Sequence, residues 1–436
     1  MHRRRLLVLA AALAAPAVAG LSVAAFAGSS WPQFRGPTMQ GVSDEKGLPE
    51  VLDAKQGVAW KTDIKGKAWS SPVIADGKVW LSTATPDGKE LSVVRLDAKT
   101  GKVEHDEVLF RVANPQFCIP FNSYASPTPV IEGDRVYVTF GSPGTACLDA
   151  KTGAKIWERT DLQCNHFRGP GSSPTLWQDR LFMNYDGSDF QYIVALDKAT
   201  GKTLWKTDRS ADYRDADPKT GKPKADGDFR KSFTTPRVAT YNGRTEVVSV
   251  GSKCAYAYDP ATGKELWRLE FAAAGNPDSH TVGVTPVLGP DLMYLCTGNG
   301  KSEMWAVKPG GTGQLNGDAI VWRVKKNVPK RASPLLVDGL LYTVDDDGMA
   351  ICTDAKTGEE AWKQRLSGKG FSASPTFADG RIYFVGENGA TTTILPGREF
   401  KKVGEGEFPD GFMASPAVAD GAFFLRTKTA LYRVGK

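Results

Sequence analysis

The sequence predicts an all-β protein, an eight-bladed β-propeller whose blades are four-stranded and antiparallel. Three observations lead to this fold class. The five letters DAKTG begin at Asp97, Asp149 and Asp354, and near copies begin at Asp197 and Asp259. A Ser-Pro or Thr-Pro followed by an apolar run occurs eight times, with the prolines at positions 72, 127, 174, 236, 286, 334, 375 and 416. Between these marks, short apolar runs alternate with Gly and Asp turns, which is typical of propeller blades.

Each unit is expected to contain four strands in the same order. A short first strand follows the proline, and a second resembles RVYVTFG at 135–141. A third resembles YIVALD at 192–197, and it leads into the D-x-x-T-G element. Asp and Thr side chains bond the backbone of a tight turn, and Gly accepts the positive φ that closes it. The element is therefore predicted to join the third strand to the fourth.

A tryptophan is expected to begin the outer strand, eight residues after the turn Asp, where its flat side chain covers the seam to the neighbouring blade. The first unit has His105 at this position, and the unit after Pro286 has a longer connection that still leads to Trp322. The predicted turn and seam residues are Asp149, Gly153, Trp157, Asp197, Gly201, Trp205, Asp259, Gly263, Trp267, Asp354, Gly358 and Trp362.

The last unit has sequence for only three strands after Met413. The segment VAWKTDI at 58–64 resembles the outer strands of the other units, so we expect this N-terminal strand to pair with the last blade. Such pairing closes the ring and removes exposed sheet edges. The expected domain organisation is a signal peptide at 1–27, an N-terminal extension at 28–56 and the propeller at 57–436.

The first residues predict export. Arg3, Arg4 and Arg5 precede an apolar run at 6–15, and a small-residue cleavage site ends at Ala27, with a competing site at Ala19. A plain signal sequence is favoured over a twin-arginine signal. No later apolar run is long enough to span a bilayer. We expect a soluble monomer in the periplasm or outside the cell. The net charge is only +6, which argues against a nucleic-acid partner.

The repeat pattern A-x-D-x-x-T-G-x-x-x-W resembles that of the pyrroloquinoline-quinone-like (PQQ-like) β-propeller repeat proteins. The segment WPQFRGP at 31–37 resembles the mature start of exported propellers of the planctomycete type. Two better-understood groups share the repeat. Quinoprotein alcohol dehydrogenases are enzymes, whereas the propeller lipoprotein of the outer-membrane assembly machinery, BamB, is a scaffold. The fold does not choose between them.

The resemblance to quinoproteins implies a cofactor gripped by a disulfide between adjacent cysteines, a tryptophan floor and a calcium ion held by carboxylates. This chain has no adjacent cysteine pair and no C-x-x-C-H haem motif. We therefore expect no cofactor, with PQQ and Ca²⁺ as the alternative. Asp186 and Asp189 lie in a D-G-S-D hairpin sequence, and a calcium ion there is the minority interpretation, with no metal site as the main one.

The segments that lead into each blade's first strand, here called lead-in segments, are predicted to line one mouth of the central channel. They carry basic, aromatic and amide side chains, a combination that suits an anionic or sugar-like ligand or an acidic peptide. A merely solvated polar mouth is the competing interpretation. The candidate ligand-binding residues are Trp69, Asn122, Tyr124, His166, Arg168, Arg230, His280 and Arg331.

Two cysteines occupy equivalent places in neighbouring lead-in segments, Cys118 and Cys164. In an exported protein this favours a disulfide between them. The other four cysteines are interpreted as buried thiols. The charged insertion at 208–232 is expected to form a long loop over the mouth.

These observations together predict an exported, non-catalytic binding or scaffold propeller of the bacterial cell envelope. Its expected partner is an envelope protein or peptide, or an anionic or carbohydrate ligand. The alternative is a PQQ-dependent oxidoreductase.

Overall fold

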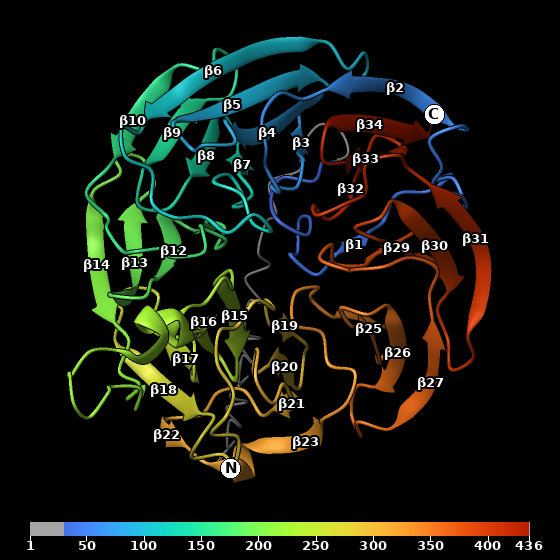
Figure 1. Ribbon diagram of the computed structural model, residues 1–436. Helices are drawn as coiled ribbons and strands as arrows, with labels where there is room; N and C mark the ends of the chain where they lie inside the picture. The colour runs from blue at the N-terminus through green and yellow to red at the C-terminus, as the bar shows by residue number, and fades with distance from the viewer. Residues whose placement is uncertain (1–29, 436) are drawn as a thin grey trace, which may run out of the picture.

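The computed structural model describes residues 30–435, so the predicted leader at 1–27 lies outside the described residues. The described chain forms eight β-sheets arranged as blades around a central axis, which confirms the predicted fold class (Figure 1). In each blade the strands follow one another antiparallel, from the centre of the ring to its rim. No helix of the described part of the chain is long and apolar enough to cross a membrane.

Blades 1 to 4 follow the predicted order of strands. Their bounds are β3 Val73–Ala75, β4 Lys78–Ala84, β5 Glu90–Asp97 and β6 Val103–Arg111; β7 Val130–Glu132, β8 Arg135–Thr139, β9 Thr145–Asp149 and β10 Lys155–Arg159; β11 Thr175–Trp177, β12 Arg180–Asp186, β13 Gln191–Asp197 and β14 Thr203–Asp208; and β15 Arg237–Tyr241, β16 Arg244–Val250, β17 Cys254–Tyr258 and β18 Glu265–Glu270.

Blades 5 to 8 complete the ring. Their bounds are β19 Val287–Leu288, β20 Met293–Cys296, β21 Met304–Val307 and β23 Ile320–Val324; β24 Leu335–Val337, β25 Leu340–Val344, β26 Met349–Asp354 and β27 Glu360–Arg365; β28 Thr376–Ala378, β29 Arg381–Val385, β30 Ala390–Leu395 and β31 Lys401–Glu407; and β32 Ala417–Ala419, β33 Ala422–Arg426, β34 Ala430–Gly435 and β2 Val58–Asp63. Four short elements lie outside this pattern: β1 Val42–Ser43, β22 Gly313–Leu315 and the 3-10 helices η1 Lys224–Arg230 and η2 Gly317–Ala319.

The ring closes through the N-terminal strand, as the sequence predicts. Strand β2 pairs antiparallel with β34, with Trp60 opposite Arg433 and Thr62 opposite Leu431. Figure 1 shows β2, in blue, outside β34, in red, where the two ends of the propeller meet. The last blade therefore gains its fourth strand from the start of the chain.

The D-x-x-T-G sequence forms the tight turn between the third and fourth strands. In blade 3 the Asp197 carboxylate accepts hydrogen bonds from the Thr200 backbone N–H at 2.8 Å and from its hydroxyl at 2.7 Å. Gly201 adopts a φ of 73°, which favours glycine. The same turn recurs inside the 208–232 insertion, where Asp217 accepts from the Thr220 N–H at 2.9 Å.

Tryptophans on the outer strands join neighbouring blades. The Trp205 indole N–H donates to the Pro260 carbonyl of the next blade at 3.0 Å, and its ring leaves no room for a Cβ at Gly263. Equivalent indole bonds to the next blade are made by Trp60, Trp157, Trp322 and Trp362.

Three of the eight seams depart from this arrangement, and at the one between blades 7 and 8 strand β31 contains no tryptophan. His105 covers Gly153 in blade 2, and the bond to the Ala150 carbonyl comes instead from Arg95, at 3.2 Å. Trp267 faces blade 5, which has a longer connection in place of the D-x-x-T-G turn. Its indole N–H therefore has no turn carbonyl to bond and donates to the Glu246 carboxylate at 2.9 Å. Strand β22 of the longer connection pairs in parallel with β18 and covers this seam.

The N-terminal extension crosses the end of the central channel. Trp31 pairs with Ile74 of blade 1, and strand β1 pairs in parallel with β28 of blade 7. Between them, Arg35 donates to the Pro334 carbonyl of blade 6, and the Gln40 amide donates to the Leu288 carbonyl of blade 5 at 2.7 Å. Trp31 and Arg35 are each only 1% exposed. The extension therefore acts as a floor that ties the inner strands of several blades together.

Candidate ligand-binding funnel

Eight hydroxyl side chains, one from each blade, form a closed hydrogen-bonded ring around the channel, here called the girdle. The backbone N–H of each girdle residue donates a hydrogen bond to the hydroxyl oxygen of the girdle residue in the following blade, over 2.9 to 3.2 Å. A proline follows each girdle residue and favours an extended backbone there. The girdle consists of Ser71, Thr128, Ser173, Thr235, Thr285, Ser333, Ser374 and Ser415.

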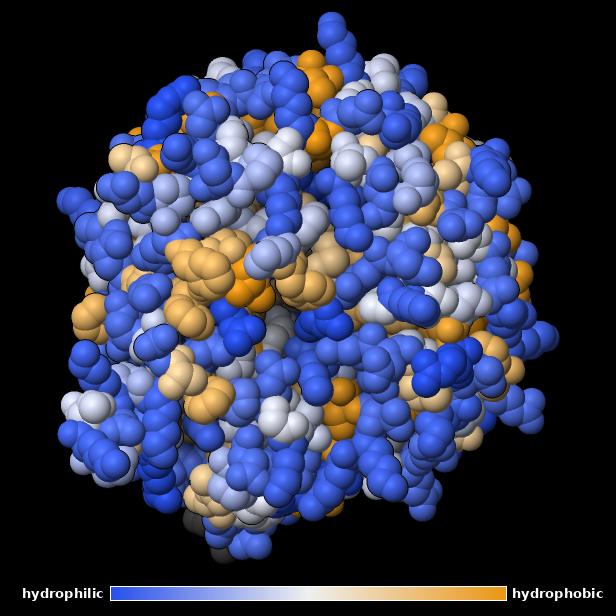
Figure 2. Space-filling model, in the orientation of Figure 1, coloured by the Kyte–Doolittle hydropathy of each residue, from blue (hydrophilic) through white to orange (hydrophobic). Residues whose placement is uncertain are grey.

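A funnel of about 480 Å³ opens from the girdle to one face of the propeller. All eight girdle residues line it, and Phe34 of the extension contributes to its floor. Its walls include Trp69, Ile119, Phe121 and Phe233. Figure 2 shows this face hollowed at its centre, with hydrophobic side chains gathered on one side of the hollow and hydrophilic ones on the other. This size and mixture of apolar walls and polar groups suit a small ligand or a short segment of a partner.

Four of the predicted ligand-binding residues line this funnel: Trp69, Asn122, Arg168 and Arg331. The Trp69 indole donates to the Phe121 carbonyl at 2.9 Å, and this bond holds the segment around Phe121 at the rim. The Asn122 amide donates to the Arg168 carbonyl at 3.0 Å and to the Pro170 carbonyl at 3.1 Å. Neighbouring lead-in segments are thus bonded to one another.

Both arginines at the rim are held in ion pairs. Arg168 meets the Asp228 carboxylate with its Nε at 2.6 Å, and Asp228 belongs to η1 in the 208–232 insertion. Arg331 lies 2.8 Å from Glu387 and 3.1 Å from Asp346, and its guanidinium lies 4.7 Å from the centre of the Phe121 ring. The insertion therefore reaches the mouth, and acidic side chains neutralise the charge of both arginines, whereas Lys330 of the lining forms no ion pair with an acid of the described chain.

The other four predicted residues do not line the funnel. The Tyr124 hydroxyl donates to the Gln116 carbonyl at 2.8 Å, and Arg230 pairs with Asp215 inside the insertion at 2.7 Å. His166 is 8% exposed and its Nε2 accepts the Ser142 N–H at 2.9 Å. Burial lowers the pKa of His166 well below its usual value, so the ring is neutral. His280 packs against Phe229 at 4.4 Å, and partial burial lowers its pKa.

The disulfide predicted between Cys118 and Cys164 is not formed, and this expectation is corrected. Both residues are free thiols. The Cys118 sulfur faces the Arg168 carbonyl at 3.7 Å, whereas the buried Cys164 sulfur lies 3.7 Å from the His166 ring nitrogens. Equivalent sequence positions bring the two loops together, but each side chain has its own surroundings. Burial raises the pKa of Cys118 to about 11 and that of Cys164 to about 12.

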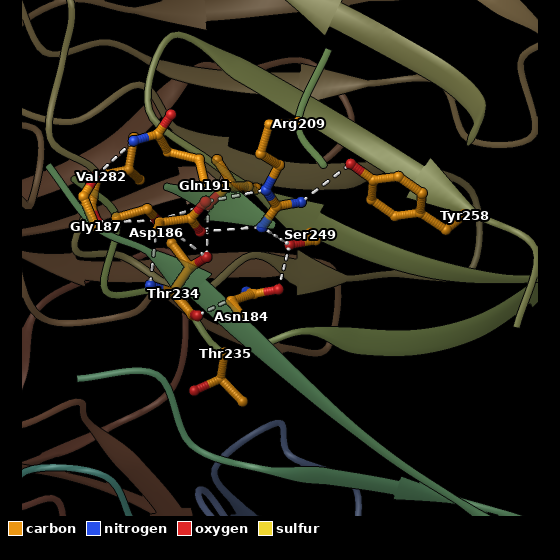
Figure 3. Close-up of polar contacts among 12 residues, drawn as sticks. Asn184, Asp186, Gly187, Gln191, Arg209, Thr234, Thr235, Ser249, Tyr258 and Val282 are labelled. Atoms are coloured by element: carbon orange, nitrogen blue, oxygen red, sulfur yellow. Dashed lines mark hydrogen bonds and ion pairs between the residues drawn. The ribbon is translucent and has the colours of Figure 1, made fainter. Parts of the chain in front are cut away.

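Asp186 belongs to a buried ion pair between blades 3 and 4 (Figure 3). Arg209 donates to both of its carboxylate oxygens at 3.0 Å, and neither side chain is exposed to solvent. Arg209 also donates to the Ser249 hydroxyl at 2.8 Å and to the Tyr258 hydroxyl at 3.2 Å. Asp189 instead accepts the Asn165 N–H at 2.6 Å. The two aspartates therefore serve the fold, and the part of the chain described here holds no group of three side chains suited to a metal ion.

The girdle is the part of the site that the sequence analysis missed. Its signal is visible in retrospect, because every girdle hydroxyl immediately precedes the proline of its unit. In blade 2 the girdle residue is Thr128, which precedes Pro129. The proline equivalent to those of the other units is therefore Pro129, two residues after the Pro127 that the sequence pattern indicates. The floor residue Phe34 was missed as well, because nothing in its local sequence connects it to the channel.

Comparison with known proteins agrees with this architecture. A family model described as outer membrane protein assembly factor BamB matches residues 41–182, 189–315 and 311–395. The structure of BamB from Moraxella catarrhalis superposes with a TM-score of 0.55 at 12% identity, covering 86% of this chain and 99% of that one. The structure of quinohemoprotein alcohol dehydrogenase ADHIIG from Pseudomonas putida HK5 gives 0.62 at 13% identity, covering 93% and 80%.

A curated relative comes from the quinoproteins. The chain is 26% identical over 258 residues to quinoprotein ethanol dehydrogenase of Pseudomonas aeruginosa, which is 53% of this chain and 39% of the relative. The matches span less than half the length of each of the curated relatives compared. The structural likeness establishes the fold alone.

Proposed function

The chain belongs to the family described as outer membrane protein assembly factor BamB, and from this premise we propose that it is a non-catalytic binding propeller of the cell envelope. The funnel is its binding site, and the ligand is a segment of a partner protein or an anionic or sugar-like group. Export through the N-terminal leader places it in the envelope. The rim residues Trp69, Phe121, Asn122 and Arg331 are the proposed contacts.

One observation carries this proposal. The funnel presents aromatic walls and amide and hydroxyl groups, and its two rim arginines are already paired with carboxylates. Paired charges are poor proton donors or acceptors but are good at fixing the shape of a recognition surface. The exposed ring of Phe121, 43% accessible at the rim, supplies the kind of aromatic anchor on which binding sites depend.

Site-specific photocrosslinking in the cell envelope tests the proposal. A photoreactive phenylalanine analogue at Phe121 is expected to capture a discrete partner or ligand. The same analogue at Phe190 is the matched control, because that side chain is 60% exposed and does not line the funnel. Equal labelling at both positions, or none at Phe121, would contradict binding in the funnel.

The second candidate is a PQQ-dependent oxidoreductase, which the similarity to quinoprotein ethanol dehydrogenase favours. The residues do not fit the site that quinoproteins lead one to expect. Asp346, the one carboxylate lining the funnel in the described chain, is paired with Arg331 at 3.1 Å, and adjacent cysteines are absent from the sequence. Of the features that the quinoprotein resemblance implies, the funnel has a tryptophan, Trp69, on its wall.

Calorimetric titration of the purified protein with PQQ in calcium buffer separates the two candidates. We expect no saturable heat and no dye reduction with simple alcohols. Micromolar binding that is lost in Trp69→Ala, together with dye reduction, would replace the binding proposal with the enzyme.

A further inference from the structure

The girdle hydroxyls have hydrogen-bond capacity left over. Each oxygen accepts one backbone N–H, and within residues 30–435 none of the eight donates its own proton to a protein atom. All eight residues are 6% exposed or less, and all line the funnel. A buried hydroxyl proton needs an acceptor, so a ligand rich in acceptor oxygens would complete this ring.

Three buried arginines surround the girdle. Arg35 donates to the carbonyl of Pro334, Arg237 to that of Pro286 at 3.4 Å, and Arg426 to the hydroxyl of Ser70 at 2.6 Å. Each of these acceptors is the chain neighbour of a girdle residue.

None of the three guanidinium groups forms an ion pair with a carboxylate of the described chain. Burial lowers the pKa of Arg35 and Arg426 to about 9 and that of Arg237 to about 10, so all three remain charged at neutral pH. Two nitrogens of Arg35, Nε and Nη1, are buried without a hydrogen-bond partner among residues 30–435. The surroundings of the girdle are therefore positive, and buried charge of one sign calls for an opposite charge.

We propose that the girdle binds an oxyanion group, a phosphate, sulfate or carboxylate, through its inward hydroxyl protons in the positive field of Arg35, Arg237 and Arg426. This inference rests on the proposed binding function and specifies its ligand. The aromatic walls above the girdle then hold the remainder of the molecule that carries the anion. A neutral sugar gains nothing from the three cations, which is why an anion is favoured over it.

Inorganic phosphate is the first probe, titrated at constant ionic strength and followed by calorimetry and by ³¹P line broadening. The test variant is Thr235→Val with Thr285→Val, which removes two hydroxyls and keeps their shape. Each lost hydrogen bond to an anion lowers affinity about tenfold. Thr235→Ser with Thr285→Ser retains both hydroxyls and is expected to bind phosphate as the native protein does.

A third variant controls for damage to the fold. Thr175 is buried on the inner strand β11 and its hydroxyl donates to the Pro236 carbonyl at 2.7 Å, outside the funnel lining. Thr175→Val is expected to lose stability but to keep phosphate binding. If the double valine variant fails to fold, Arg35→Gln leaves every hydroxyl in place and is expected to weaken phosphate binding several-fold.

Two results would overturn the inference: no saturable phosphate binding by the native protein, or equal binding by the double valine and double serine variants. A short peptide with a free C-terminal carboxylate, compared with its amidated form, then distinguishes a partner's chain end from a free anion. Crosslinking from Phe121 is measured separately, so a failure of phosphate binding at the girdle is distinguishable from a failure of the proposed binding function and leaves that function standing.

Discussion

The backbone N–H of Ser415, in the last unit of the chain, donates a hydrogen bond of 3.1 Å to the hydroxyl of Ser71, in the first. This bond closes the propeller at its axis, and the pairing of β2 with β34 closes it at the rim. The last and first units of the propeller are therefore held together both at the inner end and at the outer end of the last blade. A propeller closed in this way joins its last blade to its first both at the axis and through the strand that completes the last sheet.

The outer closure is expected to depend on Trp60. Its indole donates to the Ala98 carbonyl at 3.1 Å, and its ring fills the space above Gly101. Replacing Trp60 with Ala should cost about 3 to 5 kcal/mol in the free energy of unfolding, and replacing it with Phe about 1 kcal/mol, because Phe loses mainly the hydrogen bond. Urea unfolding followed by tryptophan fluorescence measures both, and equal losses would contradict a packing role.

The seam requires glycine at Gly263 for two separable reasons. Gly263 has a positive φ, and a Cβ there would lie 2.5 Å from the Trp205 ring. Gly243 in the same blade has a positive φ of 77° but open space around it. Gly243→Ala should therefore cost about 1 kcal/mol for backbone strain, whereas Gly263→Ala should add a further 1 to 3 kcal/mol for the clash. Thermal unfolding of the two variants isolates the contribution of the seam.

The repeated turns are expected to make stability fall in acid. Hydrogen bonds from the threonine of each turn lower the pKa of Asp97, Asp149, Asp197 and Asp354 below the usual value. A carboxylate with a lowered pKa in the folded state contributes stability above its unfolded pKa of about 4 and loses it as the pH falls through the folded value. Unfolding free energies at pH 7 and pH 3 should therefore differ less after Asp149→Asn, Asp197→Asn and Asp354→Asn together. An unchanged difference would argue against the turns as its source.

The buried pair of Asp186 and Arg209 should be sensitive to loss of one partner. Asp186→Asn leaves the Arg209 charge buried without compensation, and about 3 to 5 kcal/mol of stability is expected to be lost. The exposed pair of Lys402 and Glu405, 2.9 Å apart, provides the comparison, since Glu405→Gln should cost less than about 1 kcal/mol. Similar losses at the two sites would contradict the importance of burial.

All six cysteines should be free in the purified protein. Alkylation after denaturation without reductant is expected to modify six thiols, measured by intact mass. In the native state, labelling at neutral pH should be slow, because burial raises the pKa of Cys118 to about 11 and that of Cys164 to about 12. Four modified thiols would instead restore the disulfide that the sequence suggests.

The sequence predicts the blades well because each blade depends on local patterns. The Asp197 turn and the strands around it involve residues within a few positions of one another, so a short motif contains the necessary information. The closure of the ring could also be predicted from the sequence. The segment at 58–64 resembles the outer strands of the other units, and the last unit lacks such a strand.

The site was harder to predict because its contacts join distant parts of the chain. Arg168 counts as a free cation in the sequence, yet its partner Asp228 lies in an insertion 60 residues away. His166 has the position of a mouth residue, but its ring turns inward to accept the Ser142 N–H. The girdle bonds link separate units, so the hydroxyl before each proline has no visible role until the ring is assembled.

The floor of the funnel also constrains the order in which the molecule can form. Residues 31–43 contact the inner strands of blades 1, 2, 5, 6 and 7, and the Arg237 guanidinium of blade 4 donates to the Met39 carbonyl at 2.7 Å. These contacts cannot all exist until most of the chain is present. Contacts with such long sequence separation are slow to form. The floor is synthesised before all eight blades, and folding is expected to finish with it.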